Sequence, residues 1–344
     1  MSNDAPRVYV LSTIEAGADL IQALNGRVPL AGIIGLSERP PSDAISGYIS
    51  MRPLAERLGV DFVVVDGYSL TGVEDRRRLE ALDIDLLLVC GWQRLVPEWL
   101  IRHCRVGTVG THGSSAGISG GRGRSPQNWA LMLGAARFSI SIFFIDAGID
   151  SGPVIATRTF PYEPWDDIAS SYVKATLLTA EMVAAAWADG SLAVNRAIAQ
   201  NGDTFFLPQR KPEDGGIDWS RSATEVSRFI AALSRPYPGA FTVLDGGGRL
   251  IIWRARPLSL PGMASDQAAG TVVMVTAAGK LVVATGNGLV LVDEYEILGH
   301  APPTLSVGKV MRSEDFHEQM RSIIGRHRLR FPDQPLSSDI LDAQ

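Results

Sequence analysis

The stretch that decides the fold is DFVVVDGYSLTGVEDRRRLEALDIDLLLVC, residues 61–90. It begins with a β-branched run at 61–65, continues through a charged segment with helical spacing at 76–82, and ends with an apolar run at 85–90. Continuous apolar runs on either side of an amphipathic helix are typical of parallel strands that helices cover on both faces. The stretch therefore predicts a β-α-β unit.

The same alternation extends in both directions from this unit. Further strands are expected at 7–12, 30–34 and 106–111, and further helices at 16–24, 51–58 and 96–103. Together they predict an α/β fold with a Rossmann-like, doubly wound and mostly parallel sheet. Ligands of such sheets bind beyond the carboxyl ends of the strands, so the residues after Cys90 and after Val109 are expected near the chemistry.

The second half of the chain lacks this alternation of strands and helices. Residues 208–220, PQRKPEDGGIDWS, are polar and rich in Pro and Gly, which is typical of a linker. An amphipathic helix at 222–233 and a turn at 236–241 follow. Five short strands separated by turns then predict a small β-barrel, at 241–244, 250–255, 271–276, 280–284 and 289–292.

The chain ends with a charged helix and a Pro/Ser-rich tail, residues 311–344. We interpret this part as a solvated, peripheral segment. The alternatives are a role in oligomerisation, as in a homodimer, or in binding a substrate. The predicted domains are therefore 1–206, 207–310 and the tail at 311–344.

Composition narrows the class of protein. The 344 residues suggest roughly two domains at about 150 residues each, and 46% hydrophobic residues exclude global disorder. A net charge of -5 does not favour a nucleic-acid partner.

Two cysteines, Cys90 and Cys104, exclude a disulfide scaffold or a four-Cys zinc site and are expected as free thiols. Without a signal peptide or an apolar run of about 18 residues, a cytoplasmic protein and no membrane contact are expected.

Two segments carry candidate chemistry. His112 lies in GTHGS (110–114) at the end of a predicted strand, and Asp150 lies in DAGIDSGPVI (146–155). A carboxylate beside an imidazole orients the ring for proton transfer. The spacing alone leaves the alternatives open that His112 is a hydrogen-bonded core residue and Asp150 a turn residue.

A Gly-rich segment lies between these two. Residues 115–126, SAGISGGRGRSP, are interpreted as a flexible loop that leads into a helix at 126–133, with Ser125 as its N-cap. The segment contains no GxGxxG or Walker A pattern. Arg122 and Arg124 beside a helix N-terminus are candidates for binding an anion.

Several ordered motifs resemble the N10-formyltetrahydrofolate-dependent formyltransferases, particularly the methionyl-tRNA and sugar-amine branches and, among the latter, the aminoarabinose formyltransferase domain. They are HGS at 112–114, RGRSPQNW at 122–129, IDSGPVI at 149–155, PEDGGIDWSRSATEV at 212–226 and RPYPGAFTVL at 235–244. The resemblance covers roughly residues 5–310 and implies a C-terminal OB-like domain. It also implies that an amine attacks the formyl carbon of N10-formyltetrahydrofolate, without a metal.

The resemblance assigns roles to individual residues. His112 is expected to handle a proton and to stabilise developing charge, and Asp150 is expected to orient it. The pterin is expected against the loops that contain Gly91, Trp92, Gln93, Arg94, Leu95, Asp146 and Ile149. The acceptor is expected near Ser114, Arg122, Arg124 and Gln127.

One critical position departs from the family pattern. The catalytic Asn of the family stands two residues before the His, where this chain has Gly110. Loss of one oxyanion donor costs on the order of 10²–10³ in rate. Three outcomes follow: another donor such as Asn128, Gln127 or a water substitutes; the enzyme is a one-carbon hydrolase or an atypical transferase; or only binding of folate or amine is retained.

The acceptor is expected to be a small-molecule amine. Binding of tRNA needs several exposed cations, whereas Arg210 and Lys211 are offset by Glu213 and Asp214. The arginines of the tail come too late in the chain to match the tRNA branch. A nucleotide-linked amino sugar is the first choice, because Arg122 and Arg124 suit a phosphate, and an amino-acid-like natural-product precursor is the second.

Overall fold

The computed structural model describes residues 6–37, 45, 47–244, 247–260, 267–299 and 305–343. The chain divides into two compact units that interleave along the sequence. The first comprises Met1–Arg122, Phe138–Phe160 and Tyr172–Thr204, and the second comprises Gly123–Arg137, Pro161–Ser171 and Phe205–Gln344. A single cut after residue 206 therefore does not separate them, because two short segments of the first 206 residues cluster with the C-terminal part.

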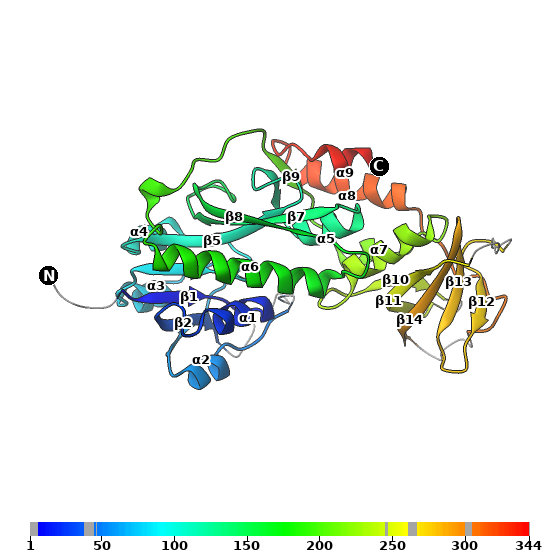
Figure 1. Ribbon diagram of the computed structural model, residues 1–344, viewed down its shortest axis with the longest axis horizontal. Helices are drawn as coiled ribbons and strands as arrows, with labels where there is room; N and C mark the ends of the chain where they lie inside the picture. Colours follow the sequence, from blue (N-terminus) through cyan, green and yellow to red (C-terminus); the bar gives the residue numbers. More distant parts are fainter. Residues whose placement is uncertain are drawn as a thin grey trace. The chain divides into compact units, whose positions relative to one another are not determined.

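The first unit is built on a seven-stranded sheet (Figure 1). Across the sheet, its strands are β3 (Asp61–Val65), β2 (Leu30–Leu36), β1 (Val8–Leu11), β4 (Leu86–Val89), β5 (Gly107–Ser114), β7 (Arg137–Phe144) and β8 (Val154–Pro161). β1 to β5 pair in parallel, and β7 runs antiparallel to β5. The order reverses at β1, which lies between β2 and β4, as the doubly wound prediction requires.

Helices connect strands β1 to β5 close to where the sequence predicted them. They are α1 (Glu15–Leu24), α2 (Arg52–Leu58), α3 (Val73–Glu80) and α4 (Glu98–His103). The long α6 (Ile168–Ala188), which follows β8, was not predicted. Leu11, Leu87 and Trp92 belong to the buried cluster on one side of the sheet. Cys104 packs in the same cluster, and both cysteines are free thiols whose pKa values burial raises.

The second unit contains a five-stranded antiparallel sheet in the order β10 (Ala240–Val243), β11 (Arg249–Leu258), β14 (Gly288–Leu298), β13 (Leu281–Thr285) and β12 (Val272–Val275). These are the five strands that the sequence predicted; the OB-like barrel stays a prediction. The unit also contains α5 (Pro126–Met132), α7 (Ala223–Leu233), α8 (Phe316–Arg330), α9 (Ser338–Asp342) and β9 (Phe205–Leu207).

The predicted linker at 208–220 is wrong as a description of this segment. Ile217 and Trp219 are completely buried, and Pro212–Gly215 forms a 3₁₀ turn. Residues 214–217 and 219 therefore belong to the buried part of the second unit, whereas residues 209, 211–213 and 220 are exposed.

The prediction of a solvated tail is also wrong. Along α8 the side chains at 316, 320, 323, 324 and 327 are buried, which is the spacing of one helix face. Arg326 forms an ion pair of 2.6 Å with the buried Asp214, and Gln319 donates to the Gly216 carbonyl at 2.9 Å. The helix is thus an integral part of the second unit.

The segment at 115–126 is more ordered than the predicted flexible loop. It contains a short strand, β6 (Gly120–Gly123). Pro126 opens α5 as expected, but Ser125 has φ of 55° and its side chain makes no capping hydrogen bond. A left-handed residue directs its side chain differently from the extended N-cap that such a bond requires.

Within the described residues, no helix is both long and apolar enough to span a bilayer, and no three His, Cys, Asp or Glu side chains gather as a metal site would need.

Candidate active site

His112 lies on β5 with both ring nitrogens engaged. The side chain is 7% exposed. Its Nδ1 is 3.3 Å from Asp150 Oδ2, and its Nε2 is 2.9 Å from the Gly121 carbonyl oxygen. Both partners are acceptors, so a ring that donates from both nitrogens satisfies both contacts. The histidine and the aspartate singled out in the sequence are thus brought together within the first unit.

The segment that carries Asp150 is closed by its own side chains. Asp146 Oδ1 accepts from the Gly148 amide at 3.0 Å and from Ser151 Oγ at 2.6 Å. A Cβ on Gly152 would lie 1.8 Å from the Phe144 carbonyl oxygen, so only glycine fits there. Asp150 itself has φ of 47°, in the left-handed region that Asp tolerates better than most residues. The Asp146 carboxylate, a candidate pterin contact, is therefore used inside the loop.

Gln200 was not among the residues chosen from the sequence. Its side-chain amide donates to the carbonyls of Asp150 and Gly152, each at 2.8 Å, and accepts from Arg122 Nη2 at 2.8 Å. It therefore contacts the segments on both sides of His112. The residue type gave no signal, since its partners are two backbone carbonyls and two side chains from distant parts of the chain.

The space beside Gly110 is filled by apolar side chains. A Cβ on this residue would lie 3.0 Å from both Cγ1 and Cδ1 of Ile145 and 3.3 Å from Phe143 Cζ. Such distances are tighter than ordinary contacts, so an asparagine at this position requires Ile145 to move. At the position where the family carries Asn, Ile145 and Phe143 thus leave little room for a side chain.

The loop after β4 is anchored on Tyr68. The Gln93 amide donates to Tyr68 Oη at 2.8 Å, the Arg94 guanidinium lies 5.2 Å from the Tyr68 ring centre, and the Trp92 ring meets Tyr68 edge to face at 4.7 Å. Gly91 takes the left-handed conformation that starts the loop. Leu95 is 64% exposed. Five residues predicted to contact the pterin thus form one loop with a shared support.

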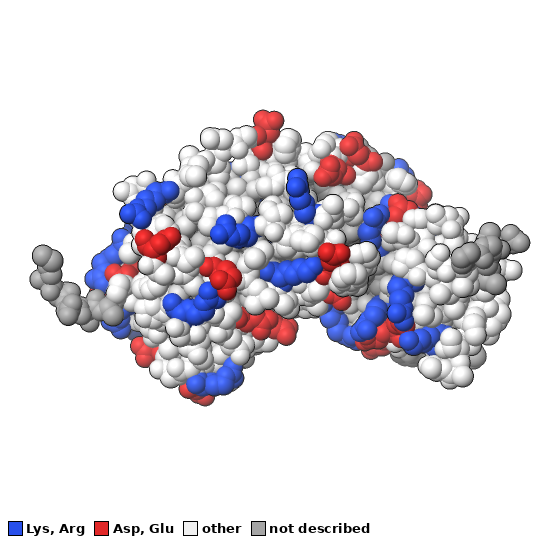
Figure 2. All heavy atoms as spheres, viewed as in Figure 1, with Lys and Arg blue, Asp and Glu red and all other residues white. Residues whose placement is uncertain are grey.

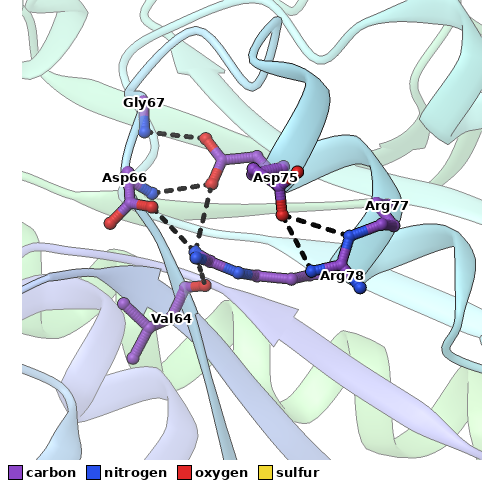
Figure 3. A network of polar contacts seen from close by, with 7 residues as sticks. Val64, Asp66, Gly67, Asp75, Arg77 and Arg78 are labelled. Carbon is purple, nitrogen blue, oxygen red and sulfur yellow. Dashed lines mark hydrogen bonds and ion pairs between the residues drawn. The ribbon is translucent and has the colours of Figure 1, made fainter.

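Tyr68 is supported in turn by a polar network at the start of α3 (Figure 3). The buried Asp75 carboxylate accepts from the amides of Asp66 and Gly67, each at 2.8 Å. Arg78 donates to Asp66 Oδ2 at 2.8 Å and to the Val64 carbonyl at 3.3 Å. The network fixes the turn immediately before Tyr68, so it supports the loop at 91–95 from behind.

Ser114 and Arg122, two residues expected to bind the acceptor substrate, make hydrogen bonds within the first unit. Ser114 Oγ donates to the Gly120 carbonyl and accepts from the Ala116 amide at 3.0 Å, so it shapes the turn after β5. Arg122 donates to Gln200, while its Nε is buried without a partner among the described residues. The Nε–H group of the Arg122 guanidinium is therefore a buried donor whose hydrogen bond is not made.

The remaining candidates, Arg124, Gln127 and Asn128, lie in the second unit. Arg124 is exposed, and Gln127 is buried. Asn128 donates to the Ala232 carbonyl at 2.5 Å and accepts from Arg210 Nη1 at 3.4 Å. Both ends of its amide are therefore already used in packing α5 against its own unit, which weakens Asn128 as the substitute oxyanion donor.

Two family models match the chain. "Formyl transferase" matches residues 65–185, and "Formyl transferase, C-terminal domain" matches residues 210–307. Both matches include residues described above: the first contains His112 and Asp150, and the second contains Asp214.

Curated relatives carry the name methionyl-tRNA formyltransferase. That of Trichlorobacter lovleyi is 30% identical over 227 residues, covering 64% of this chain and 67% of the relative. That of Geotalea uraniireducens is 26% identical over 302 residues, covering 85% and 91%.

Solved structures share the fold at lower identity. HypX from Aquifex aeolicus in complex with tetrahydrofolic acid has a TM-score of 0.59 at 18% identity, and the match covers 96% of this chain and 58% of HypX. WlaRD, a sugar 3N-formyltransferase solved with dTDP and 5-N-formyl-THF, has a TM-score of 0.53 at 12% identity over 87% of this chain and 100% of that chain.

Proposed function

The chain belongs to the formyltransferase family, and we propose that it transfers a formyl group from N10-formyltetrahydrofolate to the amine of a small molecule. The observation that carries the proposal is the contact of 3.3 Å between His112 Nδ1 and Asp150 Oδ2 at the end of β5. A buried imidazole held by a carboxylate is suited to proton transfer.

The ring of His112 supplies the donor that Gly110 lacks. The Asp150 carboxylate holds Nδ1–H, so Nε2–H points toward the acceptor that now is the Gly121 carbonyl. When substrate replaces this carbonyl, Nε2–H meets the formyl oxygen on which negative charge develops. The bond from the amine nitrogen to the formyl carbon forms and the bond to N10 breaks. N10 takes the proton from Nε2, and the proton lost by the amine restores the ring.

The loops around the site fit a pterin. Trp92 Nε1 is a buried donor without a partner among the described residues. The apolar side chains of Leu95 and Ile149 are 64% and 37% exposed. An aromatic heterocycle with polar edges offers acceptors to such a donor and flat faces to such side chains. Residues 91–95 and 146–149 are the ones proposed to hold it.

A small amine is favoured over tRNA as the acceptor. On the face that Figure 2 shows, Lys and Arg side chains lie interspersed with Asp and Glu. Arg210 is only partly exposed and Arg326 is paired with Asp214, so both add little to an exposed basic surface. The 30% identity to a methionyl-tRNA formyltransferase makes methionyl-tRNA the second candidate acceptor.

The test supplies N10-formyltetrahydrofolate and follows release of tetrahydrofolate by absorbance. Nucleotide-linked amino sugars, amino acids and methionyl-tRNA are offered in parallel, and a reaction without acceptor is the control. Turnover that requires a small amine supports the proposal. Turnover with methionyl-tRNA alone assigns the second candidate, formate release without acceptor indicates a hydrolase, and folate binding without turnover indicates an inactive binding protein; each of these contradicts the proposal.

A further inference from the structure

We propose that Gln200 is a positioning residue for the transfer, which holds both partners of the His112 ring in place. The inference rests on the proposed role of His112. It concerns a residue outside every motif of the family pattern described above, on a segment that follows α6.

The backbone places Gln200 beside the Asp150 segment. Val154 and Ile198 form an isolated antiparallel bridge, with reciprocal hydrogen bonds of 2.7 and 2.8 Å. Continued for two residues, this register sets Gln200 opposite Gly152 on the same side of the ladder. The register of this bridge therefore places the side chain of Gln200 within reach of the backbone at 150–152.

The amide nitrogen of Gln200 fixes the peptide that follows Asp150. Its two hydrogens are both used, since it donates to the Asp150 and Gly152 carbonyls at 2.8 Å each. Asp150 has φ of 47°, and backbone in this region persists only where the surroundings hold it. The two donations hold the residue in the conformation that directs its carboxylate at His112 Nδ1.

The amide oxygen of Gln200 fixes the other side of the ring. It accepts from Arg122 Nη2 at 2.8 Å and from Ser119 Oγ at 3.3 Å. Arg122 directly follows Gly121, whose carbonyl meets His112 Nε2 at 2.9 Å. One side chain therefore links the backbone on the Nδ1 side of the ring to the Arg122 and Ser119 side chains of the segment on the Nε2 side.

Glutamine is the residue type that this position requires. Its nitrogen donates twice and its oxygen accepts twice, so all four capacities are used. A glutamate of the same size keeps the contact with Arg122 but cannot donate to two carbonyls. The Gln200→Glu variant thus removes the donations to the Asp150 segment while it keeps the contact with Arg122.

The experiment measures kcat, KM for N10-formyltetrahydrofolate and the pH-rate profile for the wild type, Gln200→Ala and Gln200→Glu. Displacement of the catalytic ring predicts a kcat lower by about 10- to 100-fold in both variants, a changed pH profile, and a KM within about 2-fold. The matched control is Gln22→Ala, which removes an exposed Arg57–Gln22 hydrogen bond of 3.2 Å and is expected to change none of these.

A second readout does not depend on turnover. In protein labelled with ¹⁵N-histidine, the His112 ring signals are identified by their loss in His112→Ala, and both Gln200 variants are expected to shift them. Unchanged His112 signals, or a kcat within about 2-fold of wild type, overturn the inference. If the wild type turns over no amine, the proposed function fails while the ring signals still decide the role of Gln200. If Gln200→Ala does not fold, Gln200→Glu carries the test.

Discussion

Two buried polar networks of the molecule are built on opposite principles. In the first unit, the His112 ring stands between two acceptors, 3.3 Å from Asp150 and 2.9 Å from Gly121. In the second unit, the buried Asp214 carboxylate meets the Arg326 guanidinium at 2.6 Å and the Lys211 amide at 2.7 Å, while its carbonyl accepts from Arg210. One network presents donors that a substrate can share, and the other neutralises its own charges.

This difference separates chemistry from stability. The Asp214 network ties segments far apart in the sequence, since Arg326 is 112 residues from Asp214. Arg210 lies over the rings of Trp129 and Phe229 at 5.5 and 5.4 Å, and burial lowers its pKa to about 10. We therefore expect substitutions in the first network to change rates and those in the second to change the free energy of unfolding.

The largest effect is expected from His112→Ala. Removal of a proton-transferring group costs about 10²–10⁴ in rate, and here the same ring also serves as the oxyanion donor, so kcat should fall at least about 10³-fold. Steady-state kinetics measures the loss, and a thermal melt serves as control and should shift little. A rate within 10-fold of wild type would contradict the claim that the His112 network carries the chemistry.

Asp214→Ala should have the opposite effect, a lower free energy of unfolding with little change in kcat. It leaves the Arg326 and Lys211 donors without their carboxylate. Removing one partner of a buried pair costs about 3–5 kcal/mol, and since Arg326 is about one-third exposed we expect about 2 kcal/mol. Denaturant unfolding measures the change, with kcat per folded molecule expected to stay within about 2-fold of wild type. Loss of activity without loss of stability would place this network in the chemistry.

Gly110→Asn tests whether the apolar side chains beside Gly110 can accept the side chain that the family carries. Because Ile145 occupies that space, the single substitution should lower kcat by about 10-fold through displacement of the site. Adding Ile145→Ala should restore part of the rate. Gly325→Asn on α8 is the control, since no atom lies within 4 Å of a Cβ there and its φ is not positive. A single variant faster than wild type would show that His112 does not replace the missing donor.

The smallest effect concerns the pH dependence of the second unit. Burial raises the pKa of Glu225, but hydrogen bonds from Ser222 and Arg221 outweigh it and lower that pKa to about 2. A carboxyl whose pKa is lowered by folding stabilises the protein above its unfolded value of about 4.3 and loses this contribution as pH falls toward 2. Glu225→Gln should therefore lower the melting temperature at pH 7 and make no difference near pH 2. An effect of this substitution on the pH profile of kcat would contradict the expectation that residues of the second unit change stability and not rate.

Much of this arrangement could be predicted from the sequence. The apolar run at 85–90 and the similar runs before and after it predicted the parallel strands, because buried parallel strands are continuously apolar. The amphipathic pattern at 222–233 predicted α7, whose start the structure shows capped by Ser222 and Glu225. His112 and Asp150 were found through motifs, and the structure sets them 3.3 Å apart.

What was missed has physical reasons. Gly121 and Gln200 contact the site through backbone carbonyls or a neutral amide, which leave little trace in residue type. Burial of α8 was missed although Phe316, Met320 and Ile323 carry the helical spacing, because the charges between them suggested a solvated helix. The contact of Ile145 with Gly110 depends on the pairing of β7 with β5, which no local pattern specifies.

The most direct test of the central claim is a double-mutant cycle of His112→Ala and Asp150→Asn, with kcat for formyl transfer as the measured quantity. If Asp150 acts by holding His112, the double variant should be no slower than His112→Ala, so that the two losses do not add. Losses that multiply in the double variant would show that the two residues act independently and would contradict the proposed pair.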